Sequence, residues 1–307
     1  MSTKIILNPY SNRWGARKQA SLLRQLLIDM GYDFDFVEMA RPGHGIELAS
    51  EAVAQGYDTV VAAGGDGTIN EVVRGLVMDG QTAGARLGVI PLGSANDYAY
   101  QLGIPTDLQA ACQLLVRAEH VRQLDLGRAD DWVFMNDFII GLGAEVNMEA
   151  AKITWLRGDL LYVAGALKAI LKGQWPRVAL RWDGGEMAQK GVLMVYVGIG
   201  YRTGGVYFLT PDAQQDDGLL DVVVADARSR LGVFKLLPQT FKGAHLTAPG
   251  MNLIRCTELS IECADPVPVL VDGEIVATDA RSIKVRSLPG AIQVISGATP
   301  GPRPARS

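Results

Sequence analysis

Short apolar stretches alternate with longer amphipathic stretches up to about residue 120. The apolar stretches predict β-strands at Lys4–Leu7, Phe34–Val37, Asp58–Ala63 and Leu87–Pro91. In the stretches between and after them, apolar residues recur every three or four positions, which predicts helices at Gly15–Met30, Gly45–Gln55, from Thr68 onward, Ala95–Leu102 and Asp107–Ala118. Strands that alternate with helices in this way form a parallel sheet covered on both faces. Ligands of such a sheet bind beyond the carboxyl ends of its strands.

From about Val121 the pattern changes to short strands that Gly, Asp and Pro separate. This pattern is typical of an antiparallel β domain. Trp155–Leu171 is the exception, because its apolar residues have helical spacing. The predicted organisation is an α/β domain at residues 1–125, a β-sandwich domain at 126–297 and a disordered tail at 298–307, where Pro, Gly and Arg are frequent.

The composition is that of a globular protein, since 48% of the 307 residues are hydrophobic and 20% are charged. The net charge of −4 argues against nucleic acid as the main partner, because a phosphate backbone attracts a basic surface. Cys112, Cys256 and Cys263 have no CxxC spacing, which indicates free thiols in a reducing compartment. The start has the pattern of a strand rather than a signal peptide, and no apolar run of about 18 residues follows. We therefore expect a cytoplasmic protein.

A glycine-rich loop joins the third predicted strand to its helix. The strand leads into Gly64–Gly67, and Thr68 follows. Glycines let a backbone approach a ligand closely, and the N–H groups at a helix N-terminus bind phosphate. Thr68 and Glu71 have the spacing of a capping box, which would start the helix at Thr68. Asp66 suits a phosphate site if Mg²⁺ lies between them, since hard cations prefer carboxylate oxygens. The open alternative is a plain strand–turn–helix junction with an exposed Asp66.

Three further positions carry residues of the same kind. After the fourth strand, Ser94 and Asp97 have the S-x-x-D spacing of a helix start, and Asn8 ends the first strand. Asp125 interrupts an apolar strand, where an acid without a partner would be costly. Each also has a simpler interpretation: capping for Ser94 and Asp97, an Asn-Pro turn for Asn8, and an exposed strand edge for Asp125.

Six motifs follow one another along the chain: NPYS from Asn8, GGDGTINEVV at Gly64–Val73, PLGSANDYA at Pro91–Ala99, LDLG at Leu124–Gly127, DDGLLD from Asp216 and LVDGE at Leu270–Glu274. In this combination the sequence resembles the diacylglycerol kinase catalytic-domain family, and within it the soluble bacterial lipid kinases. The resemblance implies an α/β nucleotide-binding domain like those of phosphofructokinases and NAD kinases, followed by a β-sandwich that helps to form the lipid cleft. It implies Mg²⁺-dependent transfer of phosphate from ATP to a lipid hydroxyl, with diacylglycerol giving phosphatidic acid.

The resemblance also implies roles for individual residues. It implies that ATP contacts Asn8, Pro9, Tyr10, Ser11, Asn12, Gly65, Asp66, Gly67, Thr68, Ile69, Asn70, Glu71 and Ser94. It implies an acidic network of Asp66, Asp97 and Asp125 around the catalytic Mg²⁺, with Glu274 as the general base. A second, structural Mg²⁺ would be bound by Gln214, Asp217 and the Leu219 carbonyl. From spacing alone, Glu274 and Asp217 fit solvated turns equally well.

The sequence departs from the family pattern at three of these positions. At one of them Ser94 stands where the family often has threonine, and the hydroxyl is kept. Asn12 stands where the family has a glycine, and Gln214 stands where it has a lysine. Asn tolerates a left-handed backbone better than most residues, so Asn12 is compatible with phosphate binding. The change at Gln214 makes the structural metal site less secure than the active site.

Two other functions stay open: phosphorylation of a soluble acceptor such as NAD, and nucleotide binding without catalysis. The intact Asp66, Asp97 and Glu274 argue against the second. The helix at Trp155–Leu171 mixes aromatic, aliphatic and basic residues, which suits peripheral contact with the inner face of a membrane as well as packing on the β domain. A homodimer is an expectation from the family alone.

Overall fold

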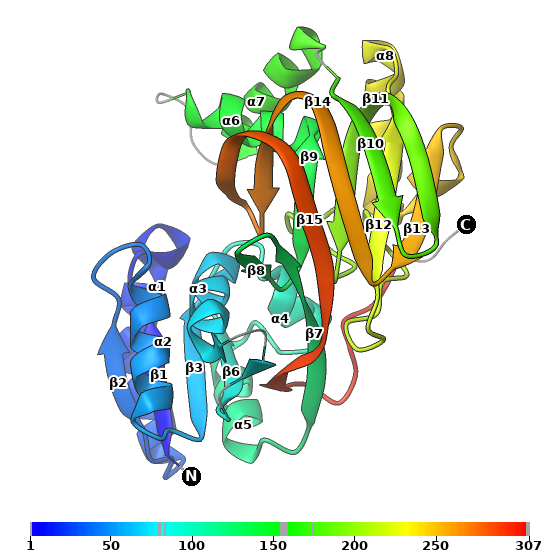
Figure 1. Cartoon of the computed structure of the whole chain (residues 1–307). Coiled ribbons are helices and arrows are strands. Elements are labelled where there is room, and N and C mark those ends of the chain that lie inside the picture. The colour runs from blue at the N-terminus through cyan, green and yellow to red at the C-terminus, as the bar shows by residue number, and fades with distance from the viewer. Residues whose placement is uncertain (1, 79–80, 83, 154–158, 174, 305–307) are drawn as a thin grey trace. The chain divides into compact units, whose positions relative to one another are not determined.

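The computed structural model describes residues 2–78, 81–82, 84–153, 159–173 and 175–304 (Figure 1). They form two compact units, and neither unit is one continuous piece of sequence. The first unit comprises Met1–Leu126 and Leu288–Pro302, and the second comprises Gly127–Ser287 and Arg303–Ser307. The last strand of the chain therefore begins in the second unit and ends in the first.

A parallel sheet forms the centre of the first unit. Its strands lie in the order β2, β1, β3, β6, and the end of β15 pairs with β6. β3 is buried along its whole length, as expected for a strand with helices on both faces. The bounds are β1 Thr3–Leu7, β2 Asp35–Glu38, β3 Thr59–Gly64, β6 Arg86–Pro91 and β15 Glu274–Ile295.

Helices α1 to α5 surround this sheet. α2 packs against α3, and α1 packs against α5, which gives two helical layers (Figure 1). In α3 the apolar side chains form one buried stripe, as their spacing predicts. The bounds are α1 Ser11–Asp29, α2 His44–Ala54, α3 Asp66–Leu76, α4 Asp97–Gln101 and α5 Leu108–Arg117, and the short strands β4 Val77–Met78 and β5 Gln81–Thr82 follow α3.

The glycine loop turns into its helix two residues earlier than predicted. α3 begins at Asp66 rather than Thr68, and Gly65 is its N-cap residue. The predicted capping box is wrong, because Glu71 Oε2 accepts a hydrogen bond from the backbone N–H of Gly45 (2.9 Å) in α2. A tertiary contact thus uses the side chain that local capping would need.

The helix start predicted at Ser94 is also wrong. α4 begins at Asp97, after Asn96, whose backbone is left-handed (φ 49°). The Asn96 side chain holds this turn, since Oδ1 accepts from the N–H of Gly93 (2.9 Å) and Nδ2 donates to its carbonyl (3.0 Å). Ser94 is exposed on the outside of the turn.

Antiparallel strands form the second unit. The two long strands, β11 and β14, each pair with β10 along one half and with β9 along the other. Alternate residues of these strands point into one large apolar core, as in a β-sandwich. The bounds are β8 Trp132–Phe134, β9 Asp137–Gly141, β10 Arg177–Trp182, β11 Gly185–Gly198, β12 Leu220–Asp226, β13 Met251–Cys256 and β14 Glu258–Val271, while β7 Val121–Ala129 begins in the first unit.

Helices pack on the strands of the second unit. α6 packs against α7, and α7 also contacts α8, with Ile170, Val233 and Leu236 in a shared apolar cluster. α7 corresponds to the helix predicted at Trp155–Leu171, of which residues 155–158 lie outside the described residues. The bounds are α6 Leu142–Ala151, α7 Asp159–Lys172, α8 Arg230–Leu236, and the 3₁₀ helices η1 Leu237–Lys242 and η2 Ala244–Thr247.

The C-terminal segment differs from its predicted place in the β domain. Residues 291–295 end the parallel sheet of the first unit, where Val294 pairs with Leu87 in β6. Beyond them, the N–H of Gly301 donates to the Tyr100 carbonyl (3.1 Å), and the Tyr100 hydroxyl donates to the Pro302 carbonyl (2.7 Å). Part of the segment predicted as a disordered tail therefore packs against α4.

The predicted fold class is confirmed: an α/β unit comes first and a β-rich unit follows. Among the described residues, no helix combines the length and the apolar character needed to cross a membrane. Cys112, Cys256 and Cys263 are free and buried. Burial raises the pKa of Cys112 and Cys263 to about 11 and the pKa of Cys256 to about 12, so these thiols stay protonated at neutral pH.

Candidate active site

Three loops meet at the carboxyl edge of the parallel sheet in the first unit. The register pairs Gly64 at the end of β3 with Pro91 at the end of β6. Backbone hydrogen bonds continue past the strand ends, from the N–H of Asn8 to the Ala63 carbonyl (3.0 Å) and from the N–H of Leu92 to the Gly64 carbonyl (2.8 Å). The loops after β1, β3 and β6 therefore lie side by side at the edge where ligands of such sheets bind.

Glycines allow two of these loops to touch. A Cβ on Gly65 would lie 3.1 Å from the Cα of Gly93, and a Cβ on Gly93 would overlap the Cα of Gly65. Only glycine fits at both positions without moving the backbone. Gly67 is different, because a Cβ there would meet no heavy atom of the described chain within 4 Å. The space beside the first turn of α3 is therefore open to a ligand.

A cluster of short polar side chains joins the first loop to the second. Asn8 Nδ2 donates to Thr68 Oγ1 (3.0 Å), and the Ser11 hydroxyl lies 3.3 Å from the same oxygen. Ser11 Oγ also accepts a hydrogen bond from the N–H of Gly65 (3.4 Å), while Asn8 Oδ1 accepts from the N–H of Tyr10 (3.0 Å). These bonds fix Asn8, Tyr10, Ser11 and Thr68, all predicted ATP contacts, next to the glycine loop.

The first turn of α1 has an unusual backbone. Asn12, Arg13 and Trp14 have φ angles of 49°, 53° and 73°, so three consecutive residues adopt the left-handed conformation. Each costs on the order of 1 kcal/mol in a residue other than glycine. The Ser94 hydroxyl donates to Asn12 Oδ1 (3.5 Å), which brings the third loop to this turn. Strained backbone of this kind clusters at ligand-binding sites.

Two of the predicted acids lie at neighbouring helix starts. Asp66 begins α3, and its Oδ1 accepts a hydrogen bond from the N–H of Tyr98 (3.0 Å) in the first turn of α4. Asp97, the residue before Tyr98, is 5% exposed. The structure thus brings the Asp66 carboxylate to the helix start that carries Asp97.

The third predicted acid, Asp125, is buried in β7. It is 3% exposed, and its Oδ1 accepts a hydrogen bond from the N–H of Gly290 (2.7 Å). The alternative of an exposed acid at a strand edge is therefore wrong. Gly290 reaches this place only because the C-terminal segment returns to the first unit.

Some predicted ATP contacts have side chains that point into the protein. Ile69, Asn70 and Glu71 are at most 9% exposed, and Glu71 is bonded to the N–H of Gly45. These side chains pack inside the unit under the loop. Of the predicted contacts in this segment, Gly65, Asp66 and Gly67 are the ones that reach the surface.

In the second unit, the predicted base Glu274 lies next to a tight turn. Val271 pairs with Glu274, so Asp272 and Gly273, both with positive φ, form a two-residue hairpin between β14 and β15. Glu274 itself is exposed. The local pattern predicts this turn correctly, but it does not reveal what holds it in place.

Asp272 is a structural anchor that the sequence did not reveal. Its Oδ1 accepts hydrogen bonds from the N–H groups of Asn136 (3.0 Å) and Asp137 (2.8 Å), and its Oδ2 accepts from the N–H of Met135 (2.8 Å). In return, the N–H of Asp272 donates to the Asp137 carbonyl (2.9 Å). One side chain therefore fixes the hairpin that carries Glu274 to the segment before β9.

Comparison with known proteins agrees with both units. Residues 2–129 match the profile of the diacylglycerol kinase catalytic domain. Residues 137–296, more than half of the chain, match the profile of the YegS C-terminal NAD kinase beta sandwich-like domain. The chain belongs to the diacylglycerol kinase catalytic-domain family. The predicted family is thereby confirmed, and with it a kinase activity.

Relatives of this kinase match it along most of its length. It is 28% identical over 296 residues to a diacylglycerol kinase of Mycobacterium tuberculosis, which covers 94% of this chain and 93% of the relative. It is 27% identical over 274 residues to a diacylglycerol kinase of Bacillus subtilis, which covers 88% of this chain and 89% of the relative. Both alignments span the two units.

Solved structures share the fold of this kinase. A diacylglycerol kinase from Bacillus anthracis superposes with a TM-score of 0.78 at 22% identity, over 97% of each chain. An NAD kinase from Archaeoglobus fulgidus, crystallised with ATP, superposes with a TM-score of 0.55 at 14% identity, over 97% of this chain and 94% of that one. At these identities the likeness shows the fold alone.

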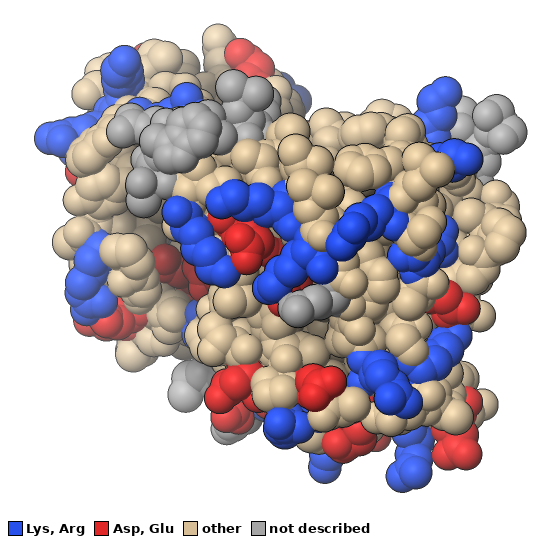
Figure 2. Space-filling view, turned by 90° about the horizontal axis from the view of Figure 1, so that it is seen from above, with Lys and Arg blue, Asp and Glu red and all other residues tan. Residues whose placement is uncertain are grey.

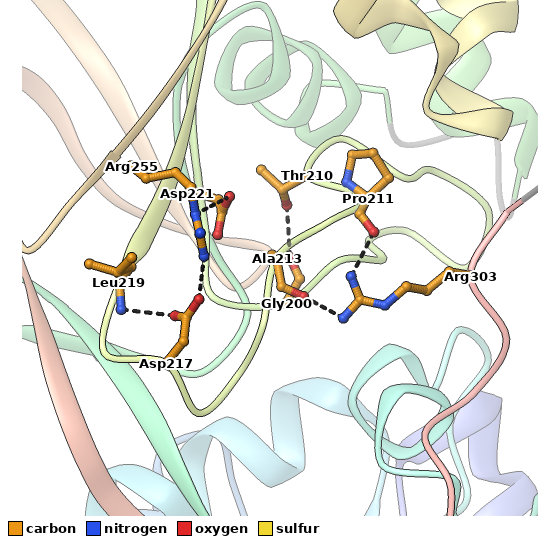
Figure 3. A network of polar contacts seen from close by, with 9 residues as sticks. All are labelled: Gly200, Thr210, Pro211, Ala213, Asp217, Leu219, Asp221, Arg255 and Arg303. Atoms are coloured by element: carbon orange, nitrogen blue, oxygen red, sulfur yellow. Dashed lines mark hydrogen bonds and ion pairs between the residues drawn. The ribbon is translucent and has the colours of Figure 1, made fainter. Parts of the chain in front are cut away.

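The residues predicted for a structural Mg²⁺ in this kinase do not fit a metal ion well. Asp217 Oδ1 accepts from the N–H of Leu219 (3.0 Å), and Oδ2 is bound by the guanidinium of Arg255 (Figure 3). Gln214 is exposed. Burial raises the pKa of neighbouring Asp221 to about 6, although Arg255 lowers it. The carboxylate expected to bind a cation is thus already occupied by an arginine.

Proposed function

We propose that this kinase transfers the γ-phosphoryl group of ATP to the hydroxyl of a lipid alcohol, with diacylglycerol as the first candidate and phosphatidic acid as its product. The observation that carries the proposal is the loop at Gly65, Asp66 and Gly67, which combines a helix start, open space and an acid. The lipid acceptor is supported by the relatives, because those from M. tuberculosis and B. subtilis are both called diacylglycerol kinases.

The phosphates of ATP would lie against the first turn of α3. The first N–H groups of a helix have no partner within the helix, and its positive end favours an anion. Gly67 leaves room for the phosphates there. The side chains of Asn8, Ser11 and Ser94, together with the strained turn at Asn12, would complete the nucleotide contacts. Pro9 and Tyr10 would border them.

Asp66 would bind the Mg²⁺ of Mg–ATP, with Asp97 and Asp125 behind it. The bond from the N–H of Tyr98 fixes Asp66 Oδ1, so the carboxylate would be held in place to bind the ion. When bound, Mg²⁺ neutralises charge on the β- and γ-phosphates and so favours transfer. Asp97 and Asp125 would add carboxylate charge near the ion, which a hard cation such as Mg²⁺ favours.

Glu274 would act as the general base. As the lipid oxygen forms its bond to the γ-phosphorus, the bond from that phosphorus to the bridging β–γ oxygen breaks and ADP leaves. The hydroxyl proton passes to the Glu274 carboxylate. Asp272 would support this step as a positioning residue, because it fixes the hairpin on which Glu274 lies.

The acceptor lipid would be reached by docking of α7 and α8 on the inner face of the membrane, where ATP is supplied. Exposed apolar side chains gather on these helices: Val163 (63% exposed), Leu167 and Leu171 on α7, and Leu231 (65% exposed) and Phe234 on α8. Lys168, Lys172, Arg230 and Lys235 accompany them. Figure 2, which views the molecule from above, shows several Lys and Arg side chains on this face, with a few acidic side chains between them. Such a mixture binds anionic membrane surfaces.

The experiment is an assay of the purified full-length protein with labelled ATP, Mg²⁺ and vesicles that contain diacylglycerol. We expect label in the lipid fraction, and we expect Asp66→Ala to abolish it while the far-UV circular dichroism stays unchanged. Asp29→Ala, an exposed acid at the end of α1, is the matched control and should keep full activity.

The same assay separates the alternatives. The fold shared with NAD kinases makes a soluble acceptor the second candidate, so one arm replaces the vesicles with NAD. Label in NAD and none in lipid would refute the lipid proposal. ATP binding without transfer in either arm would indicate a nucleotide-binding protein without catalysis.

A further inference from the structure

The segment at residues 210–221 of the second unit, a loop together with the first two residues of β12, contains four acids, and we call it the 210–221 loop. They are Asp212, Asp216, Asp217 and Asp221, and the last two contact Arg255. The Asp221 side chain is only 2% exposed. A buried carboxylate is stable in a fold only when a cation or hydrogen bonds compensate its charge. The family resemblance implies a divalent cation at this place, bound through Asp217.

In this chain an arginine side chain lies where that cation is expected. Arg255, on β13, binds Asp217 Oδ2 through Nη2, and its Nε lies 3.3 Å from Asp221 Oδ1 (Figure 3). The other Asp217 oxygen accepts from the N–H of Leu219 (3.0 Å). The planar guanidinium thus bridges two carboxylates, a geometry that arginine provides and a point charge does not.

A second arginine binds the other end of the same loop. Arg303 Nη1 donates to the Pro211 carbonyl (2.9 Å) and Nη2 donates to the Ala213 carbonyl (2.7 Å). Its guanidinium carbon lies 4.5 Å from the centre of the Tyr201 ring, within cation–π distance. Binding two backbone carbonyls of one loop is what a structural cation does when it orders a loop. Figure 3 shows Arg255 and Arg303 on opposite sides of this loop.

Arg255 and a divalent ion would compete for the same carboxylate. Mg²⁺ binds carboxylate oxygens at about 2.1 Å, so an ion on Asp217 would lie within a few ångströms of the guanidinium. Two like charges about 4 Å apart repel by several kcal/mol near a protein surface. Gln214, neutral and exposed, adds no charge that would tip the balance toward the metal.

We infer that Arg255 and Arg303 replace a divalent cation in holding the 210–221 loop, so that the second unit is stable without Mg²⁺. This inference concerns stability and does not depend on the proposed lipid substrate. It predicts that the protein's own side chains hold this loop in place, so that removal of metal ions by a chelator does not loosen the loop.

The test is thermal unfolding of the nucleotide-free, full-length protein in excess EDTA and in millimolar MgCl₂, for the wild type and for Asp217→Asn. We expect any Mg²⁺-induced shift in Tm to be the same in both proteins, because the wild-type Asp217 binds no ion. A wild-type shift that Asp217→Asn abolishes would overturn the inference.

A second comparison removes the arginine. Arg255→Met keeps the length of the side chain but leaves Asp217 and Asp221 without their cation, so we expect Tm to fall by several degrees in EDTA. Mg²⁺ should then recover part of the loss, and Arg255→Met/Asp217→Asn should not respond. Arg181→Met, at an exposed surface pair with Glu186 (3.8 Å), should leave Tm unchanged.

Two results of this comparison would overturn the inference. One is an Arg255→Met protein as stable in EDTA as the wild type, and the other is an Arg255→Met protein whose stability Mg²⁺ does not change. If Arg255→Met does not fold, Arg255→Lys serves instead, because it keeps the charge but loses the bidentate geometry. We expect the Tm of Arg255→Lys to lie below that of the wild type, although the protein should still fold. A Tm equal to that of the wild type would contradict the bridging role.

Discussion

Two glycines of one loop, Gly65 and Gly67, have opposite surroundings. Gly65 touches Gly93 of the neighbouring loop, whereas the Cβ position of Gly67 is open. Both glycines occur in the GGDGT motif, and the sequence alone does not show that their roles differ. The structure separates a glycine needed for packing from one needed for a ligand.

Gly93→Ala and Gly67→Ala should therefore affect different properties. Gly93→Ala forces the two loops apart, and we expect it to lower the free energy of unfolding by about 1–3 kcal/mol. Gly67→Ala lies within α3, where alanine stabilises a helix by up to about 1 kcal/mol, so Tm should not fall. The added methyl group should nevertheless raise the Kd for ATP roughly tenfold or more, a cost of about 1.4 kcal/mol.

Calorimetry and ATP titration measure the two effects on the same samples. If Gly67→Ala bound ATP as tightly as the wild type, the phosphates would not lie against the first turn of α3. If Gly93→Ala kept full stability, the contact between the two loops would not matter to the fold.

Asp272 offers a second contrast at the scale of one residue. Asp272→Asn keeps a side chain that tolerates left-handed backbone, but an NH₂ group would replace one acceptor oxygen in a site with three N–H donors. We expect a loss of about 1–3 kcal/mol in the free energy of unfolding. Asp279→Asn, at an exposed position on β15 after this turn, should change Tm by little. Equal effects of the two changes in urea unfolding would contradict the anchor role.

At the scale of elements, the sequence predicted the parallel sheet well and the helices of the second unit poorly. The strands β1, β2, β3 and β6 and the helices α1 to α5 each lie within a few residues of their predicted places, because hydrophobic periodicity marks them, although the short strands β4 and β5 were not predicted. α8 has seven residues with a glycine among them, and α6 contains few large apolar residues, so neither shows a clear helical period. The helix start predicted at Thr68 failed because Glu71 bonds to Gly45 in α2, and the one predicted at Ser94 failed because Asn96 bonds to Gly93 and forms a left-handed turn before α4.

The exposed face of α7 and α8 leads to a prediction at the same scale. Leu167→Glu combined with Leu231→Glu puts two charges on exposed apolar positions, so the fold should be kept while membrane affinity falls. We expect at least a fivefold loss of protein that co-sediments with vesicles of phosphatidylglycerol and phosphatidylcholine, about 1 kcal/mol. KM for ATP should not change.

The control for this prediction is Leu22→Glu, because Leu22 is 53% exposed on α1 in the first unit. It should co-sediment as the wild type does. Equal recovery of all three proteins would remove α7 and α8 from the docking surface and leave the kinase proposal itself unaffected.

At the scale of the whole molecule, the two units are not consecutive along the chain, because each is built from two separate stretches of sequence. The apolar segment at residues 291–297 was predicted as one more strand of the β domain, and its pattern fits a strand in either unit. Only the tertiary structure shows that β15 leaves the second unit after Ser287 and pairs with β6. The same return brings the N–H of Gly290 to Asp125, one of the acids that the motifs identify. The sequence therefore reveals the site residues but not the segment that supports one of them.

A chain that ends at Ser287 should lose the nucleotide site although all residues predicted to bind ATP remain. It would leave β6 paired with β3 alone and would remove the hydrogen bond from Gly290 to buried Asp125, a loss of about 1–3 kcal/mol. We expect the truncated protein to show no rise in Tm on addition of Mg–ATP. A chain that ends at Pro304 keeps every contact described for the C-terminal segment and should behave as the wild type. An ATP-dependent rise in Tm after truncation at Ser287 would mean that the first 126 residues form the nucleotide site without the returning strand.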